Sequence, residues 1–172
     1  MTGGSTSRVD GIVSLMSRTL YWIAGVILAG MVAGNLYEVI ARYVFSRPSG
    51  FMDEILTYGN MSIIFLVLAY AWRTKGHVVV DIIPMKLRGR AATNLALANL
   101  IISLLILGLL AAASLYYEVY LFEKMWRAIS TLRTPYWVSN TPICIGIVVL
   151  ILEVALSLVK GFRNRLSLVE GN

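Results

Sequence analysis

Four long apolar stretches constrain the fold of this chain more than any other feature of its sequence. They cover approximately residues 20–44, 55–72, 95–117 and 136–159. A helix that crosses a bilayer needs about 20 predominantly apolar residues, with a range of about 17 to 25, and each stretch reaches this range. We therefore predict an all-α integral membrane protein with four transmembrane helices. Because these stretches occupy most of the 172 residues, we expect one membrane domain, residues 1–172, and no sizeable soluble domain.

The amino-acid composition agrees with insertion into a membrane. Hydrophobic residues make up 58% of the chain and charged residues only 14%, whereas a soluble domain is about half apolar and a quarter charged. We do not expect a cleaved signal peptide, because the first apolar stretch is long and 19 residues precede it.

The positive charges are divided unequally between the two sides that four spans would create. The chain has a net charge of +6. Ten of its lysines and arginines fall on the side of the termini and the middle connection, and five fall on the other side. Cytoplasmic segments are the richer in Lys and Arg, so we predict that both termini are cytoplasmic. We expect the basic segments to meet anionic lipid head groups rather than nucleic acid.

Three segments outside the predicted spans have an amphipathic pattern. Residues 7–19 place Val9, Ile12, Val13 and Met16 at helical spacing, which predicts a helix on the inner surface. Residues 76–90 mix apolar and charged residues around Pro84, which breaks helices, so we predict a partly helical surface segment. Residues 119–133 again show helical spacing and are predicted to form a second surface helix or an extension of the third span. Asn140 to Pro142 predict a kink or a delayed start of the fourth span.

Aromatic and small residues add predictions about the spans. All four tryptophans fall near predicted span ends, where an amphipathic ring is favoured, and we interpret them as interfacial anchors: Trp22, Trp72, Trp126 and Trp137. Gly30 and Gly34 form a GxxxG pair in the first span, which allows another helix to approach closely. The pair could contact a helix of another protein or of the same chain, or its spacing could be a coincidence, because glycine is common in membrane helices.

Two groups of charged residues lie at the other side of the first and second spans. Glu38 and Arg42 are four residues apart, so they share a helix face and can form an ion pair. A structural pair is the favoured interpretation, with a contact to a partner or a direct role in transport as alternatives. Asp53 and Glu54 open the second span, where acidic side chains stabilise a helix N-terminus. They could instead contact a soluble partner or nearby arginines.

Two further residues are candidates on the predicted cytoplasmic side. His77 is the single histidine and lies beside Lys75, so we expect an interfacial or partner-contacting side chain. Glu153 enters the fourth span, and an intramembrane acid suggests function by default. However, Lys160 lies about two turns away near the inner end and could relieve the cost of its charge.

Enzymatic chemistry is poorly supported by the sequence. We find no Ser/His/Asp set, no phosphate-binding glycine loop and no Cys/His spacing for a metal. One histidine and one cysteine, Cys144, cannot supply a two-histidine haem site or an internal disulfide. We therefore expect no enzyme activity and no cofactor bound by this chain, and a membrane anchor for a redox enzyme is the weakest alternative.

One continuous region, RYVFSRPSGFMDEILTYGNMSIIFLVLAYAWRTKGHVVVDII, carries three motifs in order. They are the Arg-Tyr-Val-Phe end of the first span, the acidic pair, and a basic-Gly-His-hydrophobic-Asp run made by Lys75, Gly76, His77 and Asp81. A Pro-aromatic-Trp sequence in TLRTPYWVSNTPICIGI then opens the fourth span. This combination resembles the DctQ-like family, the small permease subunits of tripartite ATP-independent periplasmic (TRAP) transporters. The resemblance covers nearly the whole chain; Phe51 stands where the family often has Trp.

The resemblance implies a role that depends on partners in the bacterial inner membrane. Such small subunits pair with a large multispanning permease subunit that carries the substrate and sodium sites, and a periplasmic binding protein delivers the solute, often an organic acid. The small subunit would be a helical scaffold that also helps to dock the binding protein. The charges at Glu38, Arg42, Asp53 and Glu54 would then shape a periplasmic contact surface.

A second hypothesis is a self-sufficient small transporter, a homodimer of four-span chains with an essential intramembrane carboxylate. Its best candidates are Glu38 and Glu153. Against it, Glu38 has Arg42 as a ready partner, and neither acid lies in the middle of a span.

Overall fold

The computed structural model describes residues 3–74, 90–129 and 132–170, which form four α-helices. Their bounds are Gly3–Tyr43 (α1), Met52–Arg73 (α2), Arg90–Lys124 (α3) and Tyr136–Glu170 (α4). Each of the four contains a segment long and apolar enough to cross a membrane. The prediction of an all-helical protein with four spans is therefore confirmed.

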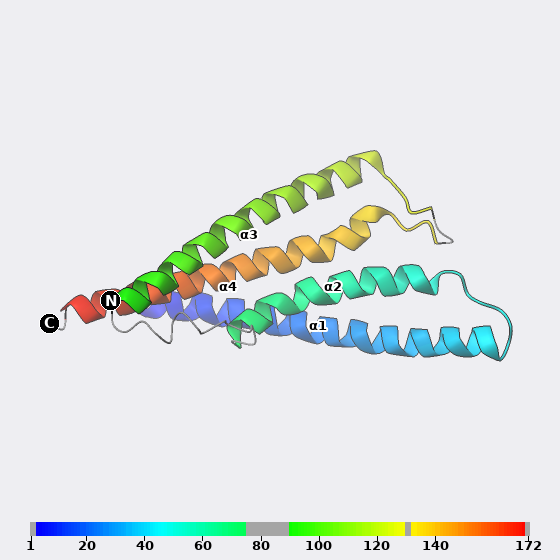
Figure 1. Ribbon diagram of the computed structural model, residues 1–172, viewed down its shortest axis with the longest axis horizontal. Helices are drawn as coiled ribbons and strands as arrows, with labels where there is room; N and C mark the ends of the chain where they lie inside the picture. Colours follow the sequence, from blue (N-terminus) through cyan, green and yellow to red (C-terminus); the bar gives the residue numbers. More distant parts are fainter. Residues whose placement is uncertain (1–2, 75–89, 130–131, 171–172) are drawn as a thin grey trace.

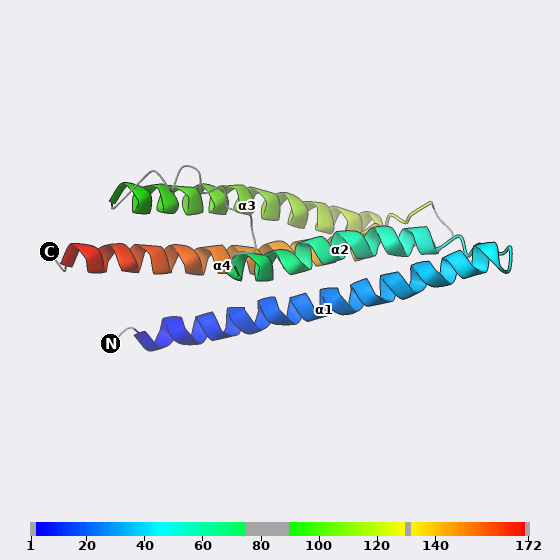
Figure 2. The same ribbon diagram turned by 60° about the horizontal axis from the view of Figure 1, so that its bottom comes forward.

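The helices pack in the spatial order α3, α4, α2, α1. The middle helix α4 packs against both α3 and α2, and α2 also packs against α1. Both termini lie at one end of the bundle, which we call the terminal end (Figure 1, Figure 2). The opposite end, the loop end, carries the connections 44–51 and 125–135, and α1 and α3 diverge toward it (Figure 1).

The length of α2 indicates where the membrane boundaries lie. Its 22 residues rise by about 33 Å, close to the hydrocarbon thickness of a bilayer of about 30 Å. One end of α2 carries Asp53 and Glu54 and the other carries Arg73. Because α2 has just the length of one crossing, we expect these charged residues to lie near the two membrane–water boundaries.

The predicted surface helix at residues 7–19 is not a separate element, because α1 continues through it without a break. Two of its residues, Val13 and Ser17, are buried in the bundle, with relative exposures of 3% and 0%. The apolar face that predicted contact with a membrane surface is thus partly used for packing against the chain itself.

The predicted helical pattern at 119–133 extends only to Lys124, where α3 ends. Met125 adopts a left-handed conformation with φ of 50°. Beyond it the backbone folds back on itself, because the Ala128 amide donates to the Thr134 carbonyl (3.0 Å) and the Tyr136 amide to the Trp126 carbonyl (3.1 Å). The prediction that the third span is extended is confirmed for residues 119–124, which belong to α3. The prediction of a separate surface helix is wrong for residues 125–129.

The fourth span begins at Tyr136, as predicted, and Pro142 lies inside α4. A delayed start is therefore wrong. The surface segment predicted at 76–90 contains His77 and Asp81 and lies outside the described residues apart from Arg90, the first residue of α3. Lys75, which precedes this segment, also lies outside them.

Glycines set the closest helix contacts, but not in the way that the sequence suggested. A Cβ atom on Gly146 of α4 would lie 2.3 Å from the backbone oxygen of Phe65 in α2. Gly34 faces the flexible Met52 side chain, whereas Gly30 has open space around it. Within this chain, only Gly34 of the GxxxG pair faces a neighbouring residue, and Gly30 does not. Gly146, which is outside the pair, allows α2 and α4 to approach closely.

Candidate functional site

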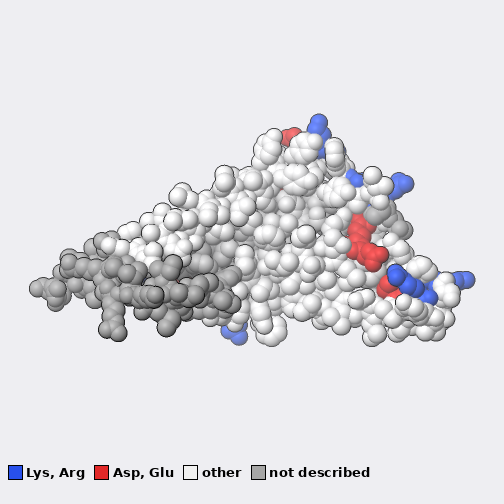
Figure 3. Space-filling view, viewed as in Figure 1, with Lys and Arg blue, Asp and Glu red and all other residues white. Residues whose placement is uncertain are grey.

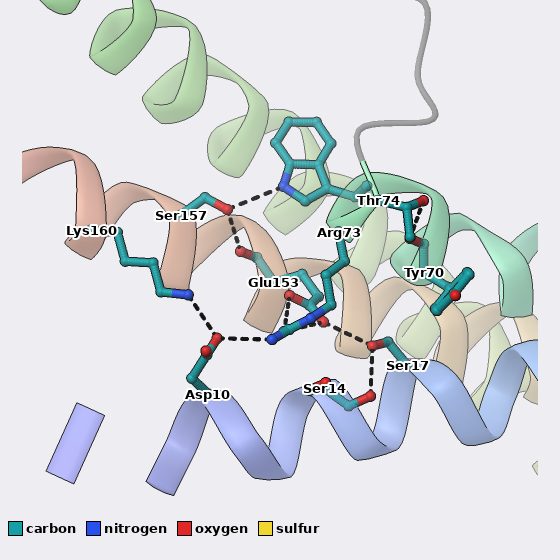
Figure 4. A network of polar contacts seen from close by, with 10 residues as sticks. Asp10, Ser14, Ser17, Tyr70, Arg73, Thr74, Glu153, Ser157 and Lys160 are labelled. Carbon is teal, nitrogen blue, oxygen red and sulfur yellow. Dashed lines mark hydrogen bonds and ion pairs between the residues drawn. The ribbon is translucent and has the colours of Figure 1, made fainter. Parts of the chain in front are cut away.

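A network of charged and hydroxyl side chains joins α1, α2 and α4 near the terminal end (Figure 4). We call it the terminal network and define it by five residues: Asp10, Ser17, Arg73, Glu153 and Lys160. Asp10 and Ser17 come from α1, Arg73 ends α2, and the other two come from α4. The network therefore connects helices that are far apart in the sequence.

Glu153 is the buried centre of the network, with a relative exposure of 3%. One guanidinium nitrogen of Arg73 donates to both of its carboxylate oxygens, at 3.1 and 3.0 Å. The Ser17 hydroxyl, which is itself fully buried, donates to Glu153 Oε1 at 2.9 Å. A buried carboxylate requires such compensation, because its desolvation is costly.

Asp10 extends the network to two cations. Its Oδ1 atom accepts from Arg73 Nη2 at 3.2 Å and from Lys160 Nζ at 2.8 Å. Arg73 thus bridges a carboxylate of α1 and a carboxylate of α4. Two carboxylates and two cations leave the four ion-paired groups with no net charge.

The terminal network differs from what the sequence suggested for Glu153. Lys160 was its expected partner, but Lys160 pairs with Asp10, and Arg73 pairs with Glu153. Sequence reasoning counted Arg73 only as a basic residue of a connection and did not select Asp10. Arg73 and Glu153 are 80 residues apart in the sequence, and Arg73 and Asp10 are 63 residues apart, so no local spacing pattern predicts either ion pair. Only the presence of acidic and basic residues near the ends of different spans could have suggested them.

At the loop end, Glu38 and Arg42 form the ion pair that their spacing predicted, at 3.1 Å. Glu38 has a second function that the sequence did not indicate, because it also accepts from the backbone amide of Ser49 (3.2 Å) and from its hydroxyl. The carboxylate therefore holds the end of the 44–51 connection against α1. Arg42 is half exposed, so its contribution to the pair is screened by solvent.

We predict that Glu38→Ala loosens this connection. Removal of the carboxylate deletes the acceptor of both Ser49 bonds, so the Ser49 amide should exchange with solvent deuterium several-fold faster. Arg42→Gln is the matched control, since it removes the ion pair and leaves both Ser49 bonds in place. Unchanged exchange over 44–51 in Glu38→Ala would contradict this assignment.

Asp53 and Glu54 lie in the first turn of α2, where acids favour a helix N-terminus. Glu54 also accepts from the Thr134 amide at 3.3 Å, which joins α2 to the 125–135 connection. Both acids line a shallow groove of about 400 Å³ together with Tyr58 and Tyr136. Figure 3 shows acidic and basic residues side by side at the loop end, beyond a broad uncharged surface over the helices.

A third polar cluster lies between α3 and α4. Asn140 Nδ2 donates to Glu118 Oε2 and Thr141 Oγ1 donates to Glu118 Oε1, both at 2.7 Å. No ion pair between described residues includes Glu118. Neutral donors therefore hold this carboxylate.

The tryptophans divide into two kinds. Trp22 and Trp126 are largely exposed, with relative exposures of 63% and 54%. Trp72 instead packs against the buried α2–α4 core and donates to the Ser157 hydroxyl at 3.3 Å. Trp137 is half-buried and packs edge-on against Phe122. An anchoring role at the interface is most direct for the two exposed rings.

These clusters connect helices and loops by ion pairs and hydrogen bonds. Where the structure describes the chain, no three His, Cys, Asp or Glu side chains are grouped so that they could hold a metal ion. Among the described residues, every buried side-chain N or O atom has a hydrogen-bond partner. The arrangement can fix the relative positions of four helices in a membrane.

Comparison with known protein families identifies a matching family model. The family model described as the DctQ component of tripartite ATP-independent periplasmic transporters matches residues 31–164. No curated protein matches the chain.

Proposed function

The chain belongs to the DctQ family of TRAP transporter components, and from this membership we propose that it scaffolds the large permease subunit during sodium-coupled uptake of an organic acid or similar solute. The family match over residues 31–164, which contain the last third of α1, all of α2 and α3, and most of α4, carries this proposal. DctQ proteins are transporter components, and the family as a whole works with a large permease and a solute-binding protein.

Two features of the structure support a scaffolding role. The spans expose broad apolar surfaces, and α3 exposes most of its apolar side chains along its length, for example Leu105 and Leu109 at 70% and 74%. Such faces suit contact with lipid or with another membrane helix. Five carboxylates of the described residues are bound to cations, hydroxyls or amides, namely Asp10, Glu38, Glu54, Glu118 and Glu153. These contacts favour a fixed helix arrangement over a binding site for solute or sodium.

In this proposal, the terminal end faces the cytoplasm and the loop end faces the periplasm. The larger share of Lys and Arg near the terminal end supports this orientation. The binding protein would then approach the charged loop end, where Asp53 and Glu54 border an open groove. The sodium gradient would be used by the large subunit.

We predict that purification of this chain from its native membrane in mild detergent recovers a large multispanning protein in stoichiometric amount. Mass spectrometry of the purified complex would identify that partner. Recovery of this chain alone, with solute uptake after reconstitution into liposomes, would overturn the proposal and support a self-sufficient transporter. In that case Glu38→Gln should abolish uptake even when combined with Arg42→Gln, whereas a structural pair tolerates the double change.

A further inference from the structure

A groove of about 350 Å³ opens between α1 and α2 near the terminal end. Four lining residues lie on one face of α1 at helical spacing, namely Ser14, Arg18, Tyr21 and Trp22. The last turn of α2 and the residue after it contribute Tyr70, Arg73 and Thr74. No Asp or Glu is among the lining residues within the described parts of the chain.

Arg18 supplies an unbalanced positive charge to this groove. Arg18 is exposed, and it takes part in no ion pair within the described parts of the chain. Arg73 also lines the groove, but its charge is matched inside the terminal network by Asp10 and Glu153. The groove therefore attracts a single negative charge.

Residues with hydroxyl groups line the same groove as Arg18. Ser14, Tyr21 and Tyr70 line the groove, and no hydrogen bond between described residues uses any of their three hydroxyls. The Tyr21 and Tyr70 rings stack with centroids 4.5 Å apart, which fixes both side chains across the α1–α2 contact. A guanidinium with several hydroxyl donors is a suitable set for the oxygens of a phosphodiester.

The position of the groove selects a lipid over a soluble anion. Its α2 residues lie at the end of a helix that is about one hydrocarbon thickness long. The next exposed side chains along this face of α1 are apolar, with Trp22 at 63% and Val26 at 71% exposure. A phosphate at Arg18 would thus place its acyl chains along apolar helix surface.

We infer that the α1–α2 groove binds the head group of an anionic phospholipid, with Arg18 as the main charge contact. The test of this inference uses the purified chain by itself, so its outcome does not depend on the proposed function. The lipid would lie directly against Arg73 and so next to the terminal network.

The test measures lipids retained by the purified full chain after release from bilayer nanodiscs that contain equal amounts of phosphatidylcholine and phosphatidylglycerol. Native mass spectrometry should show preferential retention of phosphatidylglycerol, and Arg18→Gln should lower that retention about fivefold. Arg8→Gln is the matched control, because Arg8 is an exposed arginine of the same helix outside the groove. Equal losses in both variants, or no loss in Arg18→Gln, would overturn the inference.

Two additional measurements keep the inference testable. Tyr70→Phe removes only a hydroxyl and should lower retention about twofold or more; if Arg18→Gln fails to fold, unchanged retention in Tyr70→Phe overturns the site. Displacement of phosphatidylglycerol by millimolar inorganic phosphate would indicate a site for a soluble anion and would also overturn it. Retention that resists phosphate supports a lipid site.

Discussion

Replacement of Gly146 by leucine is expected to prevent stable packing of α2 against α4. Even a Cβ atom at this position would lie 2.3 Å from the Phe65 oxygen and 2.6 Å from its carbonyl carbon. Both atoms belong to the backbone, so no side-chain rotation can relieve the overlap, and the two helices must separate. Overpacking of a core commonly costs about 1–3 kcal/mol, and we expect the upper end of this range or more.

Thermal unfolding in detergent, followed by size-exclusion chromatography, would measure this effect. Gly30→Leu is the matched control, because a Cβ on Gly30 meets nothing within 4 Å. Gly34→Ala should have an intermediate effect, since its neighbour is the movable end of the Met52 side chain. An equal melting temperature for Gly146→Leu and Gly30→Leu would show that α2 and α4 do not approach as described.

Substitution of Arg73 by alanine should destabilise the chain by about 3–5 kcal/mol, because it leaves the carboxylate of Glu153 buried without a cation. Glu153 is 3% exposed, and Ser17 alone would remain as a donor from another helix. The same change also removes the contact between α2 and Asp10 of α1. The expected result is a large loss of folded protein in detergent extracts.

A double variant separates charge burial from a simple loss of contacts. When Arg73→Met is combined with Glu153→Leu, much of the stability should return, since the buried charge is then absent. Lys160→Gln serves as a control: its side chain is 53% exposed, so we expect a loss below about 1 kcal/mol. Similar losses for Arg73→Ala and Lys160→Gln would contradict a central role of the Arg73–Glu153 pair.

Local spacing predicted part of the candidate site correctly. Glu38 and Arg42 are one helical turn apart, so helix geometry alone brings them together. The same reasoning could not find Ser49, because its approach to Glu38 depends on how the 44–51 connection turns back. It also could not pair Glu153 with Arg73, which required knowing that α4 and α2 are neighbours.

The glycines show the same limit. A GxxxG pair is visible in the sequence, yet in the fold it is divided, with Gly30 toward open space and Gly34 toward Met52. Gly146 has no partner at that spacing and was not selected, although it makes the closest approach to a neighbouring backbone. Whether a glycine serves a helix contact depends on which face of its helix meets a neighbour.

The sequence by itself determined the number of helices and their character as apolar, membrane-spanning elements. Hydropathy decides these properties, because any long apolar stretch must satisfy its backbone hydrogen bonds within a helix once it is in lipid. The tertiary structure alone decided which helices are neighbours and therefore which charges neutralise each other. Between helices in lipid there is little hydrophobic driving force, so close packing and polar contacts select the arrangement, and these depend on residues far apart in the chain.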